Sequence, residues 1–168
     1  MAAPYNWSMP WPEPVERVAV FLRASGAEAR LEEMAGDSAT AQAAADAIGC
    51  GLEQIVKSLV LMCDERAVVA LVPGDRRADP AKVAAAAGAA KARIARPPEV
   101  VAATGFVPGA VAPFPLPAGT PVLIERTILS NAVVWVGAGS DQHMAMLSPP
   151  ELVRLTRGAT VDLVQESA

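Results

Sequence analysis

Two short apolar segments, separated by three charged residues, constrain the fold of this chain more than any other feature. Residues 55–63 (IVKSLVLMC) and 67–72 (AVVALV) are rich in β-branched and other apolar side chains, which favour strands. The intervening Asp64, Glu65 and Arg66 favour a turn. We therefore predict a β-hairpin made from these two segments.

Helical and extended segments alternate along the rest of the chain. The first predicted helix runs from Pro14 and stops at Gly26, and the second covers 39–48, opened by Asp37 or Ser38 and closed by Gly49. Three further helices are predicted over 80–87 after Asp79, over 97–104, and over 149–155 after Ser148. Further strands are predicted at 91–95, 122–124, 132–136, 143–147 and 161–164, with residues 137–142 (GAGSDQ) as a turn. This interleaving predicts an α/β or α+β fold with a mixed sheet.

Length and composition point to one packed domain. The chain has 168 residues, of which 52% are hydrophobic and 19% charged, so a disordered chain is excluded. Residues 1–13 are rich in Pro and Trp without periodicity and are expected to form an irregular N-terminal arm. Residues 14–168 are expected to form the single domain.

Several classes of protein are disfavoured by charge and residue content. The net charge of −4 argues against duplex DNA as a partner. The longest uncharged run, residues 100–124, holds five prolines and three glycines, so no membrane span is expected, and without a signal sequence we expect a cytoplasmic protein. Cys50, Cys63 and the single histidine are too few for a four-ligand zinc site, so free thiols and no metal are expected.

Lys57 interrupts the first apolar segment. Because successive side chains of a strand point to opposite faces, Lys57 shares a face with Ile55, Leu59 and Leu61. A cation in this row has one of two roles. It either prevents another strand from pairing with an exposed sheet edge, with its aliphatic stem along apolar surface, or it lies at the opening of a pocket. In the second case it contacts an anionic or ester-bearing ligand, and desolvation lowers its pKa.

The uncharged loop over residues 105–113 (GFVPGAVAP) is a second candidate. Two glycines and two prolines make it rigid and open to close approach, so its backbone amides are suited to polarising an ester carbonyl. A plain connection is the alternative. The pair Arg76 and Arg77 follows a strand end, where exposed cations either hold phosphate or form a solvated turn.

Residues 137–143 carry the remaining polar candidates. Gly137–Ser140 lack the spacing and the lysine of a phosphate-binding loop. Ser140, Asp141 and His143 are the residue types of a hydrolytic triad, but they are close together in sequence and lack a nucleophile elbow, which disfavours a triad. His143 is the one side chain that titrates near neutrality, and it has either a structural or a functional role.

Taken together, these segments resemble the YbaK-type editing domains, which are relatives of the insertion domain of bacterial prolyl-tRNA synthetases. The resemblance covers nearly all of residues 15–164. It rests on five segments in order: IVKSLVL, LVPGDRRADPAKVAAAAG, KARIARPPEVVAATGFVPGAVAPF, VLIERTIL and VVWVGAGS. Lys57 matches the lysine of the family, and Gly109–Pro113 matches its GxxxP loop.

The resemblance implies a mixed, largely antiparallel curved sheet flanked by helices, and a free-standing hydrolase that clears mischarged tRNA without a metal or cofactor. Lys57 and the backbone of Gly109, Ala110, Val111 and Ala112 are the implied catalytic groups. The implied substrate-binding residues are Pro113, Gly137, Gly139, Ser140 and His143. Positioned water and the terminal hydroxyl of the tRNA take the place of a protein nucleophile.

The substrate and the rival functions stay open at this stage. A cysteine-specific relative would carry a glycine-lysine-arginine turn where this chain has residues 139–143 (GSDQH), so alanine, serine and cysteine are all candidates, with tRNA for proline as carrier. Prolyl-tRNA synthetase is a candidate partner. The alternatives are a non-catalytic module that binds tRNA or a synthetase, or a nucleic-acid-binding protein. A small-ester hydrolase unrelated to tRNA would need a nucleophile that the sequence does not offer.

Overall fold

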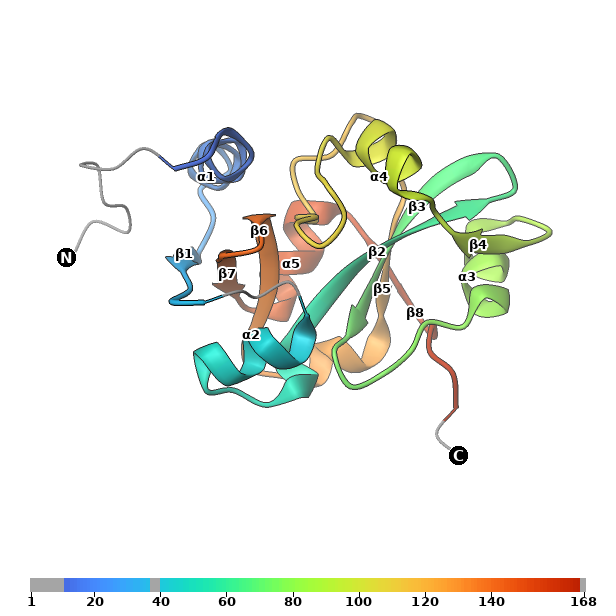
Figure 1. Cartoon of the computed structure of the whole chain (residues 1–168). Coiled ribbons are helices and arrows are strands. Elements are labelled where there is room, and N and C mark those ends of the chain that lie inside the picture. Colours follow the sequence, from blue (N-terminus) through green and yellow to red (C-terminus); the bar gives the residue numbers. More distant parts are fainter. Residues whose placement is uncertain (1–10, 37–39, 167–168) are drawn as a thin grey trace.

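The computed structural model describes residues 11–36 and 40–166. Eight strands form one sheet in the order β1-β7-β6-β2-β3-β5-β8, with β4 paired to β2 outside this path (Figure 1). The strands are β1 (Ala29–Glu33), β2 (Ile55–Cys63), β3 (Arg66–Pro73), β4 (Ala92–Ile94), β5 (Val122–Glu125), β6 (Val134–Ser140), β7 (His143–Leu147) and β8 (Ala159–Val161). The helices are α1 (Glu13–Ala24), α2 (Ala41–Ile48), α3 (Pro80–Ala87), α4 (Pro97–Thr104) and α5 (Pro149–Thr156), with 3₁₀ turns η1 (Leu52–Gln54) and η2 (Arg126–Ser130).

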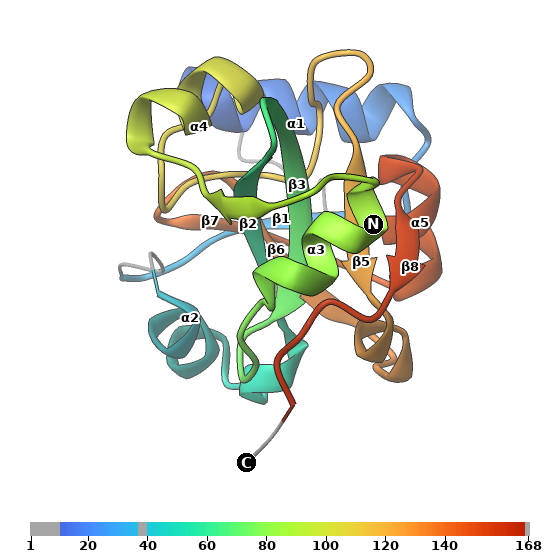
Figure 2. The ribbon, with the colours of Figure 1, turned by 90° about the vertical axis from the view of Figure 1, so that its right-hand side faces the viewer.

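The predicted hairpin is confirmed and lies in the middle of the sheet. Strands β2 and β3 pair antiparallel from Val56 opposite Pro73 to Cys63 opposite Arg66. Alternate residues of both strands enter two separate cores. Val60 and its neighbours on one face pack with α1, and Leu61 and its neighbours on the other pack with Val83 of α3. Helices therefore cover both faces of the hairpin (Figure 2).

The outer edge of β2 is shared between two strands. Strand β6 pairs in parallel with Ile55 and Val56, and β4 pairs antiparallel with residues 61–63. The N–H of Ala95 also donates to the Val60 carbonyl oxygen at 2.9 Å. Residues 57–59 consequently pair with β3 and with no second strand in the described chain. The sheet opens along this stretch.

The mixed sheet is confirmed, because four of the strand pairings are antiparallel and three are parallel within the described residues.

Two of the predicted helix caps are confirmed. The side chains of Asp79 and Ser148 accept hydrogen bonds from the first turns of α3 and α5. Thr40 caps α2, whereas the predicted caps Asp37 and Ser38 lie outside the described residues.

Two predictions of local structure are wrong, and one strand was not predicted. Residues 137–140 complete β6 instead of forming a turn, because a register shift against β7 accommodates the glycines and leaves residues 141–142 as the turn. The last strand covers residues 159–161 and not 161–164, because these are the residues that pair with β5. Residues 29–33 (ARLEE) form an unpredicted edge strand, in which Leu31 alone is apolar and buried.

Within the described residues, none of the helices has the length and apolar character needed to cross a membrane.

Candidate functional site

A cavity of about 500 Å³ lies along the open stretch of β2. Both faces of the strand reach it, because Lys57 and Ser58 point to opposite sides of the sheet and both line the cavity. The remaining walls come from α2, the turn after β3, the loop before β5, and strands β6 and β7. They include Thr40, Ala41, Ala44, Gly74, Gly109, Val111, Gly137, Ser140 and Met144.

Lys57 is held by a backbone contact at the side of this cavity. Its half-buried ammonium donates a hydrogen bond to the Arg76 carbonyl oxygen at 2.8 Å. Burial lowers the pKa of Lys57, the nearby Arg77 cation lowers it further, and Asp75 opposes the shift. Since an ammonium has three N–H donors, this contact fixes the group and leaves two donors for a ligand.

The loop that faces β2 is shaped by Pro108 and Gly109. Gly109 has a φ of +84°, and the Ala110 N–H donates to the Val107 carbonyl oxygen at 3.0 Å, which is the pattern of a type II turn. Within the described residues, the N–H groups of Gly109 and Val111 have no backbone acceptor, and both residues line the cavity. Two residues that line the cavity therefore have unpaired backbone amides.

Strand β6 and this loop approach each other closely at Gly137. A Cβ at position 137 would lie 2.7 Å from the Val111 carbonyl oxygen, closer than any real contact of this kind. Glycine is thus required for the loop to lie against the strand. The loop is also anchored to the protein interior, because Ala112 and Phe114 are fully buried in the main core.

Ser140 and His143 form a hydrogen-bonded pair beside the cavity. The Ser140 Oγ lies 2.6 Å from the His143 Nδ1 and also accepts the Gln142 N–H at 3.0 Å. His143 is buried beneath Trp11, whose ring meets the imidazole edge-on with 5.6 Å between ring centroids. Among the described residues the His143 Nε2 has no hydrogen-bond partner, so no carboxylate orients the ring and a triad is not assembled.

Burial makes His143 a neutral side chain at physiological pH. Desolvation lowers its pKa, and the opposing effect of Glu33 and Asp141 is smaller. The histidine is therefore suited to orienting the Ser140 hydroxyl, which it contacts, more than to carrying a charge into the cavity.

The structure brings half of the predicted site residues to one cavity. Lys57, Gly109, Val111, Gly137 and Ser140 line it. The others do not: Ala110, Ala112 and Pro113 are buried parts of the loop outside the cavity lining, Gly139 packs against the start of α1, and His143 contacts the cavity residue Ser140.

Ser58 is a cavity residue that sequence reasoning missed. Its Oγ is buried and has no hydrogen-bond partner in the described chain, although it lines the cavity. An unpaired buried hydroxyl is unfavourable, so this atom is ready to bind a polar ligand group. The available signal was its place beside Lys57, as the second polar residue in an apolar strand.

No metal centre is evident at this cavity. Over residues 11–36 and 40–166, no group of three His, Cys, Asp or Glu side chains is placed to hold a metal ion. Cys50 and Cys63 are both free thiols, and burial raises the pKa of each.

Comparison with known proteins identifies the family. The family model described as "Aminoacyl-tRNA editing domain" matches residues 35–155. The chain belongs to this family. The matched region contains every residue that lines the cavity.

Individual relatives include synthetases and smaller proteins. The chain is 26% identical over 128 residues to the Enterococcus faecalis protein named "Putative Cys-tRNA(Pro)/Cys-tRNA(Cys) deacylase EbsC", covering 76% of this chain and 78% of that protein. It is 31% identical over 123 residues to a proline–tRNA ligase of Xanthomonas oryzae, covering 73% of this chain but 22% of the ligase. A solved structure described as "a putative trans-editing enzyme for prolyl tRNA synthetase" superimposes with a TM-score of 0.86 at 31% identity, covering 94% of this chain and all of that one.

The buried histidine predicts a pH dependence of stability. Because the pKa of His143 is lowered on folding, the unfolded chain binds more protons, and stability falls as pH decreases below about 6.5. Urea unfolding between pH 5 and 7 should show a slope of at most about 1.4 kcal/mol per pH unit. His143→Gln removes the single histidine and should make this slope shallower, and the remainder near pH 5 comes from carboxylates such as Glu125, whose pKa folding also lowers. A slope that is unchanged in the variant contradicts the assignment.

Proposed function

We propose that the chain is a trans-acting aminoacyl-tRNA deacylase that hydrolyses the ester of a small amino acid on the wrong tRNA. One observation carries the proposal: a fixed ammonium, that of Lys57, and two free loop amides line a single cavity in an editing-domain fold. Its volume of about 500 Å³ lies within the range of small-ligand pockets. Such a reaction takes place where tRNA is charged, which favours the cytoplasm.

The groups at the cavity match the needs of ester hydrolysis. Attack by water forms a bond to the carbonyl carbon and places negative charge on the carbonyl oxygen, which the N–H groups of Gly109 and Val111 would stabilise. The carbon–oxygen bond to the ribose then breaks, and the ribose oxygen takes a proton that the water loses. Lys57 would hold the ester or the terminal ribose through its two remaining donors.

Water is favoured over a protein nucleophile at this site. The Ser140 hydroxyl contacts a histidine, but it also accepts the Gln142 N–H, and the histidine has no carboxylate to orient it in the described chain. These contacts give Ser140 a binding role. Proximity and oriented amides would supply most of the rate.

The walls of the cavity favour a small side chain. Ala44, Ile55 and Met144 supply apolar contacts from three elements, and Ser58 and Ser140 supply hydroxyls. Synthetases discriminate weakly among small amino acids, which is why a second hydrolytic site is useful. Alanine, serine and cysteine all fit this description, and tRNA for proline is the carrier that we propose, because proline–tRNA ligases contain matching segments.

A non-catalytic tRNA-binding module is the second candidate function. For the deacylase and for the binding module alike, prolyl-tRNA synthetase is the protein partner that we propose. A panel of mischarged tRNAs separates the two functions, because a binding module would retain the aminoacyl ester that a deacylase removes.

Replacement of Lys57 tests the ammonium. Lys57→Ala should lower kcat/KM for deacylation roughly 100-fold, while the melting temperature changes little because the half-buried side chain fills no core volume. Lys91→Ala is the matched control, since Lys91 is exposed and lies outside the cavity. If the two variants deacylate tRNA at the same rate, Lys57 has no role in the reaction and only protects the sheet edge from pairing with another strand.

Replacement of Gly109 tests the loop. Gly109→Val introduces a β-branched residue at a φ of +84°, and Gly119→Val does so at +85° in an open region outside the cavity. Both variants should lose about 1–2 kcal/mol of stability from backbone strain. Gly109→Val alone should also lose deacylation, roughly 100-fold, because the amides move. Similar activity in the two folded variants would exclude the loop from the reaction.

A further inference from the structure

The two arginines that follow β3 have different surroundings. The Arg76 guanidinium is half-buried and donates to the Gln165 carbonyl oxygen at 2.8 Å, while its own carbonyl oxygen accepts Lys57. Arg77 is exposed, and its guanidinium has no hydrogen-bond or ion-pair partner within the described chain. One arginine is thus used by the fold, and the other is free to bind a ligand.

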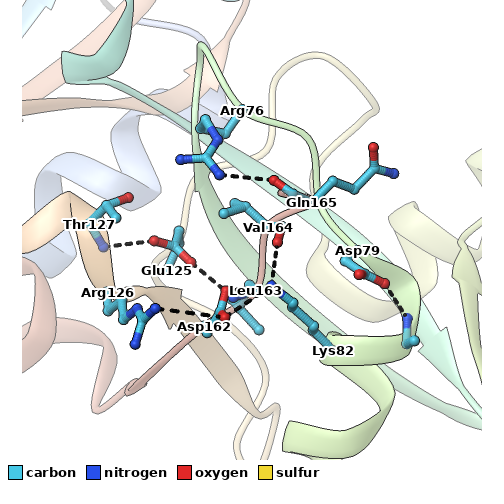
Figure 3. Close-up of polar contacts among 11 residues, drawn as sticks. Arg76, Asp79, Lys82, Glu125, Arg126, Thr127, Asp162, Leu163, Val164 and Gln165 are labelled. Atoms are coloured by element: carbon cyan, nitrogen blue, oxygen red, sulfur yellow. Dashed lines mark hydrogen bonds and ion pairs between the residues drawn. The ribbon is translucent and has the colours of Figure 1, made fainter. Parts of the chain in front are cut away.

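The backbone of Arg77 is nevertheless fixed. Its carbonyl oxygen accepts the Gln165 N–H at 2.8 Å, and the next residue, Ala78, forms an antiparallel bridge with Val164. The C-terminal segment over residues 162–166 therefore runs beside the turn and holds it in place (Figure 3).

Polar side chains, one of them buried, hold the C-terminal segment. The Lys82 ammonium donates to both oxygens of Asp162 and to the Val164 carbonyl oxygen, at 2.8–3.0 Å (Figure 3). The fully buried Glu125 carboxylate accepts the Leu163 N–H at 2.9 Å. Burial would raise the pKa of Glu125, but hydrogen bonds from backbone N–H groups lower it overall, so the anchor is a carboxylate. Because the backbone at Arg77 is already fixed, binding of a ligand by its free side chain costs little backbone entropy.

Arg77 lies close to the mouth of the cavity. Gly74 of the same turn lines the cavity, and the neighbouring Arg76 carbonyl oxygen holds Lys57. The Arg77 charge is near enough to lower the pKa of Lys57. Two cations thus stand at this side of the cavity, with Asp75 as the opposing charge.

We propose that Arg77 binds a backbone phosphate of the single-stranded 3′ end of tRNA while the aminoacylated ribose occupies the cavity. The inference rests on the proposed function. A chain with a net charge of −4 must attract a polyanion through local cations, and guanidinium groups bind phosphate with two parallel hydrogen bonds. Of the neighbouring cations, Lys82 and Arg126 already pair with Asp162, so Arg77 is the one whose binding breaks no contact.

Two substrates that differ in their phosphates test this contact. Arg77→Gln should lower kcat/KM on mischarged tRNA roughly threefold to tenfold and make its dependence on salt shallower by about 0.7 in the log–log slope. On an aminoacyl-adenosine ester, which has no phosphate, the variant should equal the wild type. Arg66→Gln, which removes an exposed cation at the far end of β3, should match the wild type on both.

Binding provides a readout that does not need turnover. Fluorescence anisotropy with uncharged tRNA should show weaker binding for Arg77→Gln, and the difference should vanish for tRNA that lacks its three 3′-terminal nucleotides. Equal losses on the phosphate-free ester, or an Arg77→Gln variant that behaves as Arg66→Gln on tRNA, overturn the inference. Failure of the wild type to hydrolyse either substrate would instead overturn the proposed function, and the binding comparison would still decide the role of Arg77.

Discussion

The site depends on incomplete strand pairing along the edge of β2 that faces away from β3. One edge of a strand accepts one neighbour at a time, and here β6 takes the first two residues while β4 takes the last three. The stretch between them has no second partner in the described chain, so polar backbone and both faces of the strand become accessible there. This opening places Lys57 and Ser58 at one cavity, although strand alternation points them to opposite faces.

The two walls of the opening are fixed by different contacts. On one side, glycine at position 137 allows the loop to approach to a distance that a Cβ would prevent, and the buried Ala112 and Phe114 anchor the loop to the core. On the other side, the C-terminal segment holds the turn whose carbonyl oxygen fixes Lys57. The loop and the ammonium are therefore fixed by the fold itself, as the proposed electrostatic catalysis requires.

Sequence reasoning predicted those parts of the molecule that local chemistry determines. The hairpin followed from two apolar runs and a charged turn, and α3 followed from a cap, a proline and a terminal glycine. Lys57 was found because a charge in an apolar row is conspicuous. Features that depend on distant pairing were missed: strand β1 carries one buried apolar side chain and exists because β7 pairs with it, and Ser58 lines the cavity because β6 diverges. The burial of Ala110 and Pro113 within the loop also depends on the fold.

The central claim, that the opening in β2 is where an aminoacyl ester is bound and polarised, is tested most directly by a crystal structure with an aminoacyl-adenosine analogue whose ester is replaced by an amide. The analogue should occupy the cavity of about 500 Å³, with its carbonyl oxygen within hydrogen-bond distance of the Gly109 or Val111 N–H and with Lys57 in contact with the ribose or the amide linkage. A second cavity of about 430 Å³ lies beneath residues 113–122, away from Lys57. An analogue bound there, or one bound at β2 with its carbonyl turned away from the loop, would contradict the account.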